Sequence, residues 1–393
     1  MVLRTFPCLT HSFVFLIVAG LTPALAFDPP VTPPGQSKKP AKITWLTPKH
    51  SVGEALLANR QVEIEFTASR DLEKIVAWLT PSLAEFLKVE PEALDSVPKD
   101  TPTKLKLSLL VDSLPHTVGG TLHLRPTGAE NDTVRRTLPP PFPVNVKVPG
   151  SDDDDEEATV NAVVGAADYD AESVAPGGIV SVFGQGLGPS ELAHLQVGKH
   201  GRVTDYLADA QVLFDGIAGP ILAARHNQVN VVVPFETAGE SDVEVMVTYK
   251  GRVGNPVLVP LHAAAPALFT LHGLGHGRGA ILNEDLTLNS PENPAPRGSV
   301  IMLFATGAGL YKEGTPTGAI VSDQLPHVLE TVQVLIGGVA GTVEYAGGAP
   351  TLVSSVVQIN VRISMDTPTG DAVPVQLVAG DRASKAQVTV AIR

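Results

Sequence analysis

Gly177-GIVSVFGQGL-Gly188 and Gly298-SVIMLFATGA-Gly309 are two versions of one segment, 121 residues apart. Each is a β-branched apolar run with one phenylalanine and a glycine-rich exit, which is typical of a buried strand followed by a turn that needs positive φ. Two more blocks repeat in the same order. They pair Gln211-VLFDGIA-Gly219 with Gln333-VLIGGVA-Gly341, identical at six of nine positions, and Gln228-Val229-Asn230-Val231 with Gln358-Ile359-Asn360-Val361. Three ordered matches predict two related β-domains.

The second block predicts a hairpin in each copy. Val212 and Phe214 face one way before Asp215-Gly216 turns the chain, and Gly337-Gly338 does the same in the second copy. The third block places an amide, Asn230 or Asn360, among β-branched residues. Such an amide either ties down neighbouring structure or recognises a ligand, and the structural role is the more frequent one. Both copies close with an alternating strand, Asp242-VEVMV-Thr248 and Ala372-VPVQL-Val378.

The region before the repeat also has strand periodicity. Val62–Phe66, Lys104–Leu107 and Pro143–Val148 alternate apolar and polar residues, as half-buried strands do. A short helix is expected near Pro81–Val89, and Trp45 and Trp78 are expected to anchor a core. These features predict a seven-strand sandwich of about 110 residues.

The fold prediction is therefore all-β, with three immunoglobulin-like β-sandwich domains in a row and the last two forming an internal repeat. The predicted boundaries are a signal peptide at 1–26, a Pro-rich tether at 27–40, an N-terminal sandwich at 41–150, an acidic linker at 151–157, repeat 1 at 158–265, an inter-repeat connection at 266–295 and repeat 2 at 296–393.

The first 26 residues predict export. An apolar run from Ser12 to Leu21 follows Arg4, and Ala24-Leu25-Ala26 is a small-x-small cleavage pattern. The run is too short to span a bilayer as a helix, so a cleaved signal is favoured over an uncleaved anchor. The lone cysteine, Cys8, precedes the run and would leave with the signal. The mature chain is then expected at the cell surface, outside the cell or in the periplasm, without disulfides or a membrane span.

Composition excludes some partners. The net charge of −13 argues against nucleic acid, which needs a concentrated basic surface. The charge is local, because residues 151–393 hold 27 acidic against 12 basic residues. With 36 Gly and 34 Pro and no triplet period, the chain is rich in turns and is not collagen-like.

The sequence offers only weak candidates for a metal site. Asp152, Asp153, Asp154 and Asp155 could supply oxygen ligands to calcium, but a plain acidic run lacks the interleaved geometry of a calcium loop and is better explained as a solvated linker. His272 and His276 are four residues apart, yet four glycines around them disfavour the helix that would align them, so a flexible loop is favoured. Motifs for a nucleophile elbow, a phosphate loop or a zinc helix do not occur in the sequence.

Residues 160–393 resemble the C-terminal domain that recurs in secreted and surface proteins of Acidobacteria, the Solibacter-type domain, on stretches such as Pro176-GGIVSVFGQGL, Gln228-VNVVVP, Ala265-PALFT and Gly279-AILNEDLTLNSPENPAPRGSVIMLFATGAG. Each half is more loosely similar to TIG-type immunoglobulin-like domains. The resemblance implies secretion and β-sandwich architecture and supplies no catalytic residue. One departure is Leu286, where the family usually has glycine, so the Asn283–Leu286 turn is expected to differ.

The favoured function is non-enzymatic: an exported multidomain protein for adhesion, surface assembly or ligand binding, whose partner is an unknown extracellular protein or glycan. Loop aromatics such as Tyr206, Tyr311 or Tyr345 would carry much of a contact unless they belong to the core. The alternative is a secreted hydrolase acting on carbohydrate or peptide, with a site assembled between domains. No cofactor is expected, although the acidic run leaves calcium as a weak possibility.

Overall fold

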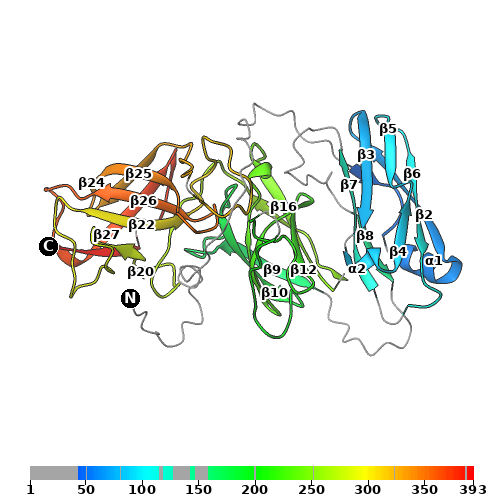
Figure 1. The fold of residues 1–393 in the computed structure, drawn as a ribbon, viewed down its shortest axis with the longest axis horizontal. Coiled ribbons are helices and arrows are strands. Elements are labelled where there is room, and N and C mark those ends of the chain that lie inside the picture. Colours follow the sequence, from blue (N-terminus) through cyan, green and yellow to red (C-terminus); the bar gives the residue numbers. More distant parts are fainter. Residues whose placement is uncertain are drawn as a thin grey trace. The chain divides into compact units, whose positions relative to one another are not determined.

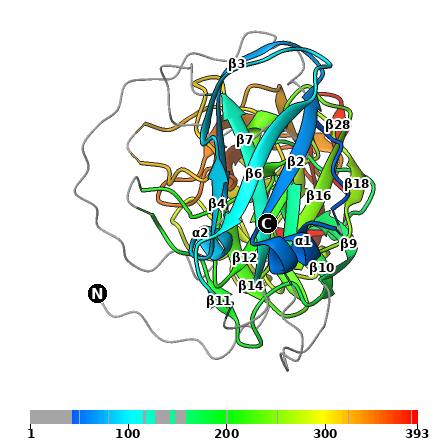
Figure 2. The same cartoon turned by 90° about the vertical axis from the view of Figure 1, so that its right-hand side faces the viewer.

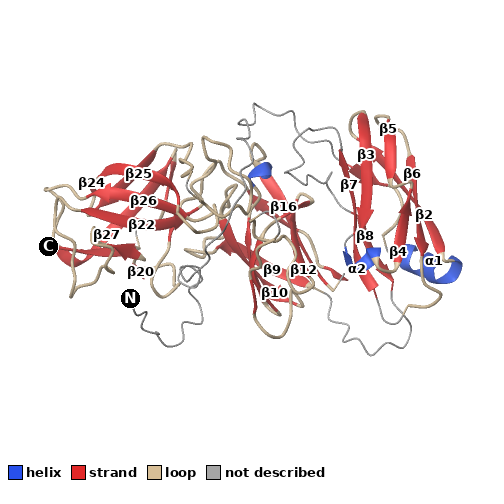
Figure 3. Cartoon of the chain, in the orientation of Figure 1, coloured by secondary structure: helices blue, strands red, loops and turns tan. Residues whose placement is uncertain are grey.

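A computed structural model describes residues 43–49, 51–79, 81–114, 118–126, 142–146, 158–198, 201–250, 252–322, 324–385 and 387–393. Antiparallel strands dominate these residues, and helices are few and short (Figure 3). The all-β prediction is confirmed. The predicted signal peptide, the Pro-rich tether and the acidic linker with Asp152–Asp155 lie outside the described residues. None of the described helices is long and apolar enough to cross a membrane.

The N-terminal sandwich has two four-stranded sheets (Figures 1 and 2). One sheet has the order β1-β2-β6-β4, formed by Ile43–Trp45, Gln61–Ala68, Thr103–Leu109 and Leu87–Glu90. The other has the order β5-β3-β7-β8, formed by Ala93–Val97, Leu72–Leu79, Val118–Pro126 and Phe142–Val146. The predicted alternation along β2 and β6 is confirmed, since Ile64, Phe66, Leu105 and Leu107 are buried.

Four details of this sandwich differ from the predictions. It has eight described strands instead of seven, and helix α1 (Ser51–Asn59) was not predicted. The predicted helix near Pro81–Val89 is only α2 (Pro81–Ala84), because the alternating Leu87–Glu90 forms β4 instead. Trp45 does pack on the core, with its ring 4.9 Å from that of Phe142. Trp78 instead points to the opposite face of β3, where it stacks on His123.

The second sandwich contains β9 to β18. Its first sheet has the order β11-β14-β15-β10-β9, formed by Ala193–His194, Ile221–Arg225, Gln228–Val232, Ile179–Gln185 and Thr159–Gly165. In its second sheet β13-β12-β16-β17 are formed by Ile217–Ala218, Ala210–Phe214, Asp242–Tyr249 and Arg252–Val253, and β18 (Val257–Pro260) also pairs with β16. A short 3₁₀ helix, η1 (Phe235–Thr237), connects the sheets.

The third sandwich contains β19 to β29. In one sheet β19-β22-β26-β25 are formed by Ala267–Leu268, Val300–Thr306, Val357–Arg362 and Thr342–Gly348, and β21 (Ile281–Leu282) also pairs with β22. In the other, β20-β29-β27-β23-β24 are formed by Gly277–Arg278, Val388–Ile392, Gly370–Ala379, Val332–Ile336 and Val339–Ala340, and β28 (Arg382–Ala383) also pairs with β27.

The internal repeat is confirmed by strand order. In one sheet β14-β15-β10 corresponds to β25-β26-β22, and in the other β13-β12-β16-β17 corresponds to β24-β23-β27-β28. The closing strands also match, because Val257 of β18 pairs with Val245 as Val388 of β29 pairs with Val375. The sequence blocks thus mark equivalent strands.

Both predicted hairpins form through the residues that permit them. Asp215 and Gly216 have φ of 47° and 80°, and Gly337 and Gly338 have φ of 60° and 82°. Positive φ at both positions is the conformation of a type I′ turn, which matches the twist of the flanking strands. Asn230 has a structural role: its Oδ1 accepts hydrogen bonds from Ser181 Oγ (3.0 Å) and Gln228 Nε2 (2.9 Å).

The segment predicted as an inter-repeat connection supplies strands to the third sandwich. β19 and β21 pair with β22, and β20 pairs in parallel with the last strand, β29. By contacts the chain forms two compact units. One contains Val164–Val180 and His262–Arg393, and the other contains the described parts of Pro34–Val163 and Ser181–Leu261.

Candidate functional site

A pocket of about 260 Å³ lies within the unit that contains Val164–Val180 and His262–Arg393. Four segments that are separate in sequence form it: the turn after β9 with the start of β10, the residues around β19, the end of β22, and the β27–β28 hairpin with the residues that follow it. Its polar lining residues are Asp168, Asp170, Glu172, Ser173, Thr306, Asp381, Arg382 and Lys385. Charged groups of both signs therefore converge on one hollow.

The turn after β9 places the first carboxylates. The Gly165 N–H donates to the Asp170 carbonyl (2.8 Å), and the Tyr169 N–H donates to the Gly165 carbonyl (2.9 Å). A Cβ at Gly165 would lie 2.4 Å from Asp168 Oδ1, so glycine lets this carboxylate fold back over the turn. The Asp170 N–H then donates to Asp168 Oδ1 (3.1 Å). The turn thus fixes the Asp168 carboxylate in the pocket wall.

The pocket contains one complete ion pair. Lys385 Nζ lies 3.0 Å from Asp170 Oδ1, and this hydrogen bond raises the pKa of the Lys385 ammonium. Asp168 is half-buried, and burial raises the pKa of its carboxyl against the smaller opposing effects of the Asp170 N–H and of Lys385. The interactions of the Asp168 carboxylate within the chain therefore compensate only part of the cost of burying its charge.

The second cation of the pocket is Arg382 on β28. One guanidinium nitrogen lies 3.5 Å from the hydroxyl of Ser173, which is at the limit of a hydrogen bond. Among the ion pairs of the described residues, none includes Arg382 or Asp168. The pocket thus holds a carboxylate and a guanidinium that line the same space without pairing.

The floor of the pocket is rigid and buried. The Ile179 N–H donates to Thr306 Oγ1 (2.9 Å), whose hydroxyl donates to the Ser355 carbonyl (2.9 Å). Gly307 has φ of 72°, and a Cβ there would lie 2.1 Å from the Ala265 carbonyl oxygen. The start of β10 and the end of β22 are thus joined by hydrogen bonds and close backbone packing, so the pocket is formed before any ligand arrives.

The glycine- and histidine-rich loop supports this pocket from outside. His272 and His276 are exposed on the loop between β19 and β20, which is not helical. The Tyr169 hydroxyl donates to the Gly273 carbonyl (2.9 Å), and a Cβ at Gly275 would lie 2.9 Å from Asp168 Cα. The loop therefore packs on the turn that carries Asp168. Within the described residues no group of three or more His, Cys, Asp and Glu side chains is placed to hold a metal ion.

The asparagines of the 279–309 stretch have structural roles. Asn289 is buried, and its carboxamide pairs with the backbone of Ala391 in β29: Nδ2 donates to the carbonyl (2.9 Å) and Oδ1 accepts from the N–H (2.8 Å). Asn289 Nδ2 also donates to Asn283 Oδ1 (3.0 Å), and Asn283 Nδ2 donates to the Asn293 carbonyl (3.0 Å). This network ties the loop before β22 to the last strand.

Leu286 lies in the backbone region that glycine favours. Its φ is 66°, and its N–H donates to the Asn283 carbonyl (2.9 Å). The turn at Asn283–Leu286 is therefore in the left-handed region although Leu286 carries a side chain. The leucine side chain is 65% exposed, so the position gains little packing in return.

The tyrosines considered as contact residues are engaged within the fold. Tyr311 is buried, and its hydroxyl donates to the Ser354 carbonyl (2.5 Å), so it is a core residue and not a contact residue. The Tyr206 hydroxyl donates to Asp209 Oδ1 (2.9 Å), and the Tyr345 hydroxyl donates to the Gly348 carbonyl (2.8 Å). The pocket residues were missed by sequence reasoning, and the only signal for them was the alternation of acidic residues at 168, 170 and 172.

No protein-family model and no curated protein matches the sequence. Among solved structures, the chain is similar to the Pseudomonas aeruginosa CupB2 chaperone (14% identity, TM-score 0.20, covering 52% of this chain and 95% of that one). It is also similar to domains 4–9 of the surface layer protein SbsC (13%, 0.19, 84% and 42%) and to the human desmocollin-1 ectodomain (12%, 0.15, 84% and 55%). Likenesses this weak say nothing about ligands, and the Solibacter-type resemblance stays a prediction.

Proposed function

We propose that this chain is an exported, non-enzymatic β-sandwich protein of the cell surface that binds a small ligand group through the pocket between the β9–β10 turn and the β27–β28 hairpin. Export is inferred from the 1–26 segment. The binding role rests on one observation: the Asp168 carboxylate and the Arg382 guanidinium, neither of which forms an ion pair among the described residues, line one preformed pocket. Half-buried charges whose interactions within the chain are incomplete cost free energy, and a ligand of complementary charge recovers it.

The neighbouring contacts are those of a binding site held in place. Lys385 and Asp170 neutralise each other, while the Thr306 hydroxyl fixes the floor. The ligand group can be free in solution or displayed on a surface polymer, and the adhesive role requires the second. In either case the sandwiches provide a rigid support from which the pocket residues project.

Retention of the purified mature chain on cell-envelope fractions of the producing bacterium tests this function. We expect Arg382→Gln to reduce retention at least fivefold. The matched control is Arg252→Gln, since Arg252 occupies the same hairpin position in the other repeat and does not line the pocket. Equal retention of wild type and Arg382→Gln would show that the pocket is not the binding site.

A further inference from the structure

We infer that the pocket binds a small zwitterion, a molecule with one ammonium and one carboxylate such as an α-amino acid, whether free or attached through its side chain. This inference rests on the proposed function and names the ligand class of the same site. The ammonium would face Asp168, and the carboxylate would face Arg382.

The first support is the balance of unpaired charge. Lys385 and Asp170 pair at 3.0 Å and leave no net charge for a ligand. Of the other charged lining residues, Glu172 and Asp381 are exposed, whereas Asp168 and Arg382 are half-buried, carry opposite charges and are not joined by an ion pair among the described residues. A cation alone would satisfy only Asp168, and an anion alone would satisfy only Arg382. A zwitterion satisfies both in one binding event.

The second support is donor geometry. A guanidinium carries five N–H donors in a planar fork that matches a carboxylate, and the contact of Arg382 in this structure is one long bond to Ser173. Asp168 Oδ1 accepts the Asp170 N–H, and neither oxygen of this carboxylate forms an ion pair among the described residues. Each group therefore has hydrogen-bonding capacity left for a ligand.

The third support is size and rim charge. A volume of about 260 Å³ lies just below the range of about 300–1,000 Å³ that is usual for drug-sized ligands, so the pocket suits a molecule of amino-acid size. Glu172 and Asp381 are exposed at its edge. Their negative charge attracts the ammonium end first and would orient the ligand as it enters.

The test is a titration of the full mature chain, followed by changes in backbone amide chemical shifts in NMR spectra. The probes are the free L-amino acids, one at a time, and then the N-acetyl and methyl-ester derivatives of each that binds. We expect at least one free amino acid to bind with shifts around Asp168 and Arg382, and each blocked derivative to bind at least tenfold more weakly. Binding of none, or of a blocked form within threefold of the free form, would overturn the inference.

Variants assign each end of the ligand. Asp168→Asn should weaken binding of the free amino acid at least tenfold and abolish discrimination against the N-acetyl form, while Arg382→Gln should do the same for the methyl ester. Arg382→Lys, which keeps the charge but loses the fork, should lie between wild type and Arg382→Gln. Arg252→Gln should change the affinity less than twofold. Equal effects of both pocket variants on both derivatives would contradict the orientation proposed here.

The two proposals can fail separately. If Arg382→Gln releases the chain from the cell envelope while no amino acid binds, the site is correct and its ligand class is wrong. If retention on the envelope is unchanged but amino acids bind as expected, the ligand class stands and the surface role is wrong.

Discussion

The two repeats share their strand order but treat the same sheet edge in different ways. In the third sandwich the outer edge of β29 is covered: the N–H groups of Gly277 and Gly279 donate to the Gln387 and Thr389 carbonyls, at 2.8 and 2.9 Å. The Asn289 carboxamide then pairs with Ala391. In the second sandwich no described strand pairs with the outer edge of the equivalent β18.

The uncovered edge is instead poor in donors. The register that aligns Val257 with Val388 places Pro256 and Pro260 at the positions of Gln387 and Ala391. Proline has no N–H, so two of the outward donors that β29 must satisfy are missing from β18. Next along the chain, the His262 N–H donates to the Val174 carbonyl (2.9 Å). The same sheet edge can thus be covered by another strand in one repeat and be deprived of backbone N–H donors by proline in the other.

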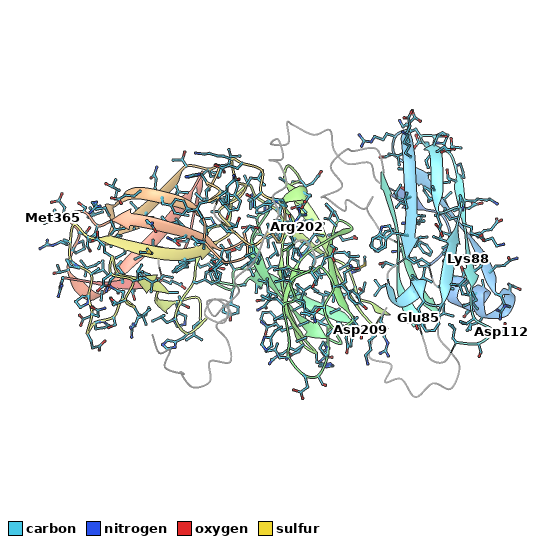
Figure 4. All side chains as sticks on the ribbon, viewed as in Figure 1. Glu85, Lys88, Asp112, Arg202, Asp209 and Met365 are labelled. Carbon is cyan, nitrogen blue, oxygen red and sulfur yellow. The ribbon has the colours of Figure 1, made fainter. Side chains whose placement is uncertain are left out.

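The N-terminal sandwich protects an edge in a third way. Its edge strand β4 alternates buried leucine and valine with the exposed residues Lys88 and Glu90, and Lys88 Nζ lies 3.0 Å from Glu90 Oε1. Lys88 is labelled in Figure 4. Charged side chains along an edge oppose the approach of another strand. The three ways of protecting an edge differ in how much stability depends on them, because only the covered edge of β29 relies on a buried polar contact.

The largest expected effect is loss of the buried contact. Asn289→Ala should destabilise the third sandwich by about 3 kcal/mol, because the buried Ala391 N–H loses its partner and Asn283 Oδ1 loses a donor, while the Ala391 carbonyl keeps the Ala295 N–H (2.9 Å). The transition is followed by circular dichroism in urea, since both tryptophans lie in the N-terminal sandwich and do not report on this region.

The chain supplies the matched control for this variant. Asn255 makes the same two-bond contact with Val160, at 2.8 and 3.1 Å, but is itself exposed. Asn255→Ala should cost less than about 1 kcal/mol, since water replaces the amide. Equal costs for the two variants would show that burial does not distinguish the edges.

The sequence was sufficient for strands and turns and insufficient for contacts between distant segments. Periodicity and turn residues predicted β2, β6 and the Asp215-Gly216 hairpin, because those signals act between near neighbours. Asp168 and Arg382 lie more than 200 residues apart in sequence, and no local sequence pattern around either residue predicts that the two line one pocket. The segment 266–295 was predicted to be a connection because its strands are only two residues long and form through tertiary pairing.

A second expected effect concerns a buried polar group with incomplete pairing. His123 is 1% exposed, its Nε2 lies 2.6 Å from Thr121 Oγ1, and its Nδ1 has no hydrogen-bond partner. Burial lowers the pKa of His123 from 6.5 to about 3. The unfolded chain therefore binds the proton first as the pH falls, so this stability is complete above pH 6.5 and is lost between pH 6.5 and 3.

The loss should reach about 2 kcal/mol at pH 5, at about 1.4 kcal/mol per pH unit. Tryptophan fluorescence measures it directly, because Trp78 stacks on His123 with ring centroids 4.2 Å apart. His123→Gln should remove this part of the pH dependence while leaving the carboxylate titrations below pH 4.5. An unchanged slope between pH 6.5 and 5 in the variant would mean that His123 is not the titrating group.

A smaller effect is expected at Leu286. A non-glycine residue in the left-handed region costs on the order of 1 kcal/mol, and this side chain is largely exposed. Leu286→Gly should therefore stabilise the third sandwich, by up to about 1 kcal/mol after the added entropy of the unfolded glycine chain is subtracted. The thermal midpoint by circular dichroism is the measurement, and Leu288→Gly is the control, since Leu288 does not have positive φ. A lower midpoint for Leu286→Gly would show that the leucine side chain contributes more than the strain removes.

The smallest effect on folding should come from restoring backbone N–H donors to the uncovered outer edge of β18. Pro256→Val with Pro260→Val restores two outward N–H groups beside Leu258, which is 69% exposed, and it should change the unfolding free energy by less than about 1 kcal/mol. Association should change more than stability, because an unpaired apolar edge recruits another strand. Sedimentation velocity should show concentration-dependent self-association beyond that of the wild type. Adding Leu258→Lys should reverse it, because a charge on the edge opposes pairing. Sedimentation identical to wild type would mean that the prolines do not protect this edge, and the contrast between the two repeats would then reduce to the cover over β29 alone.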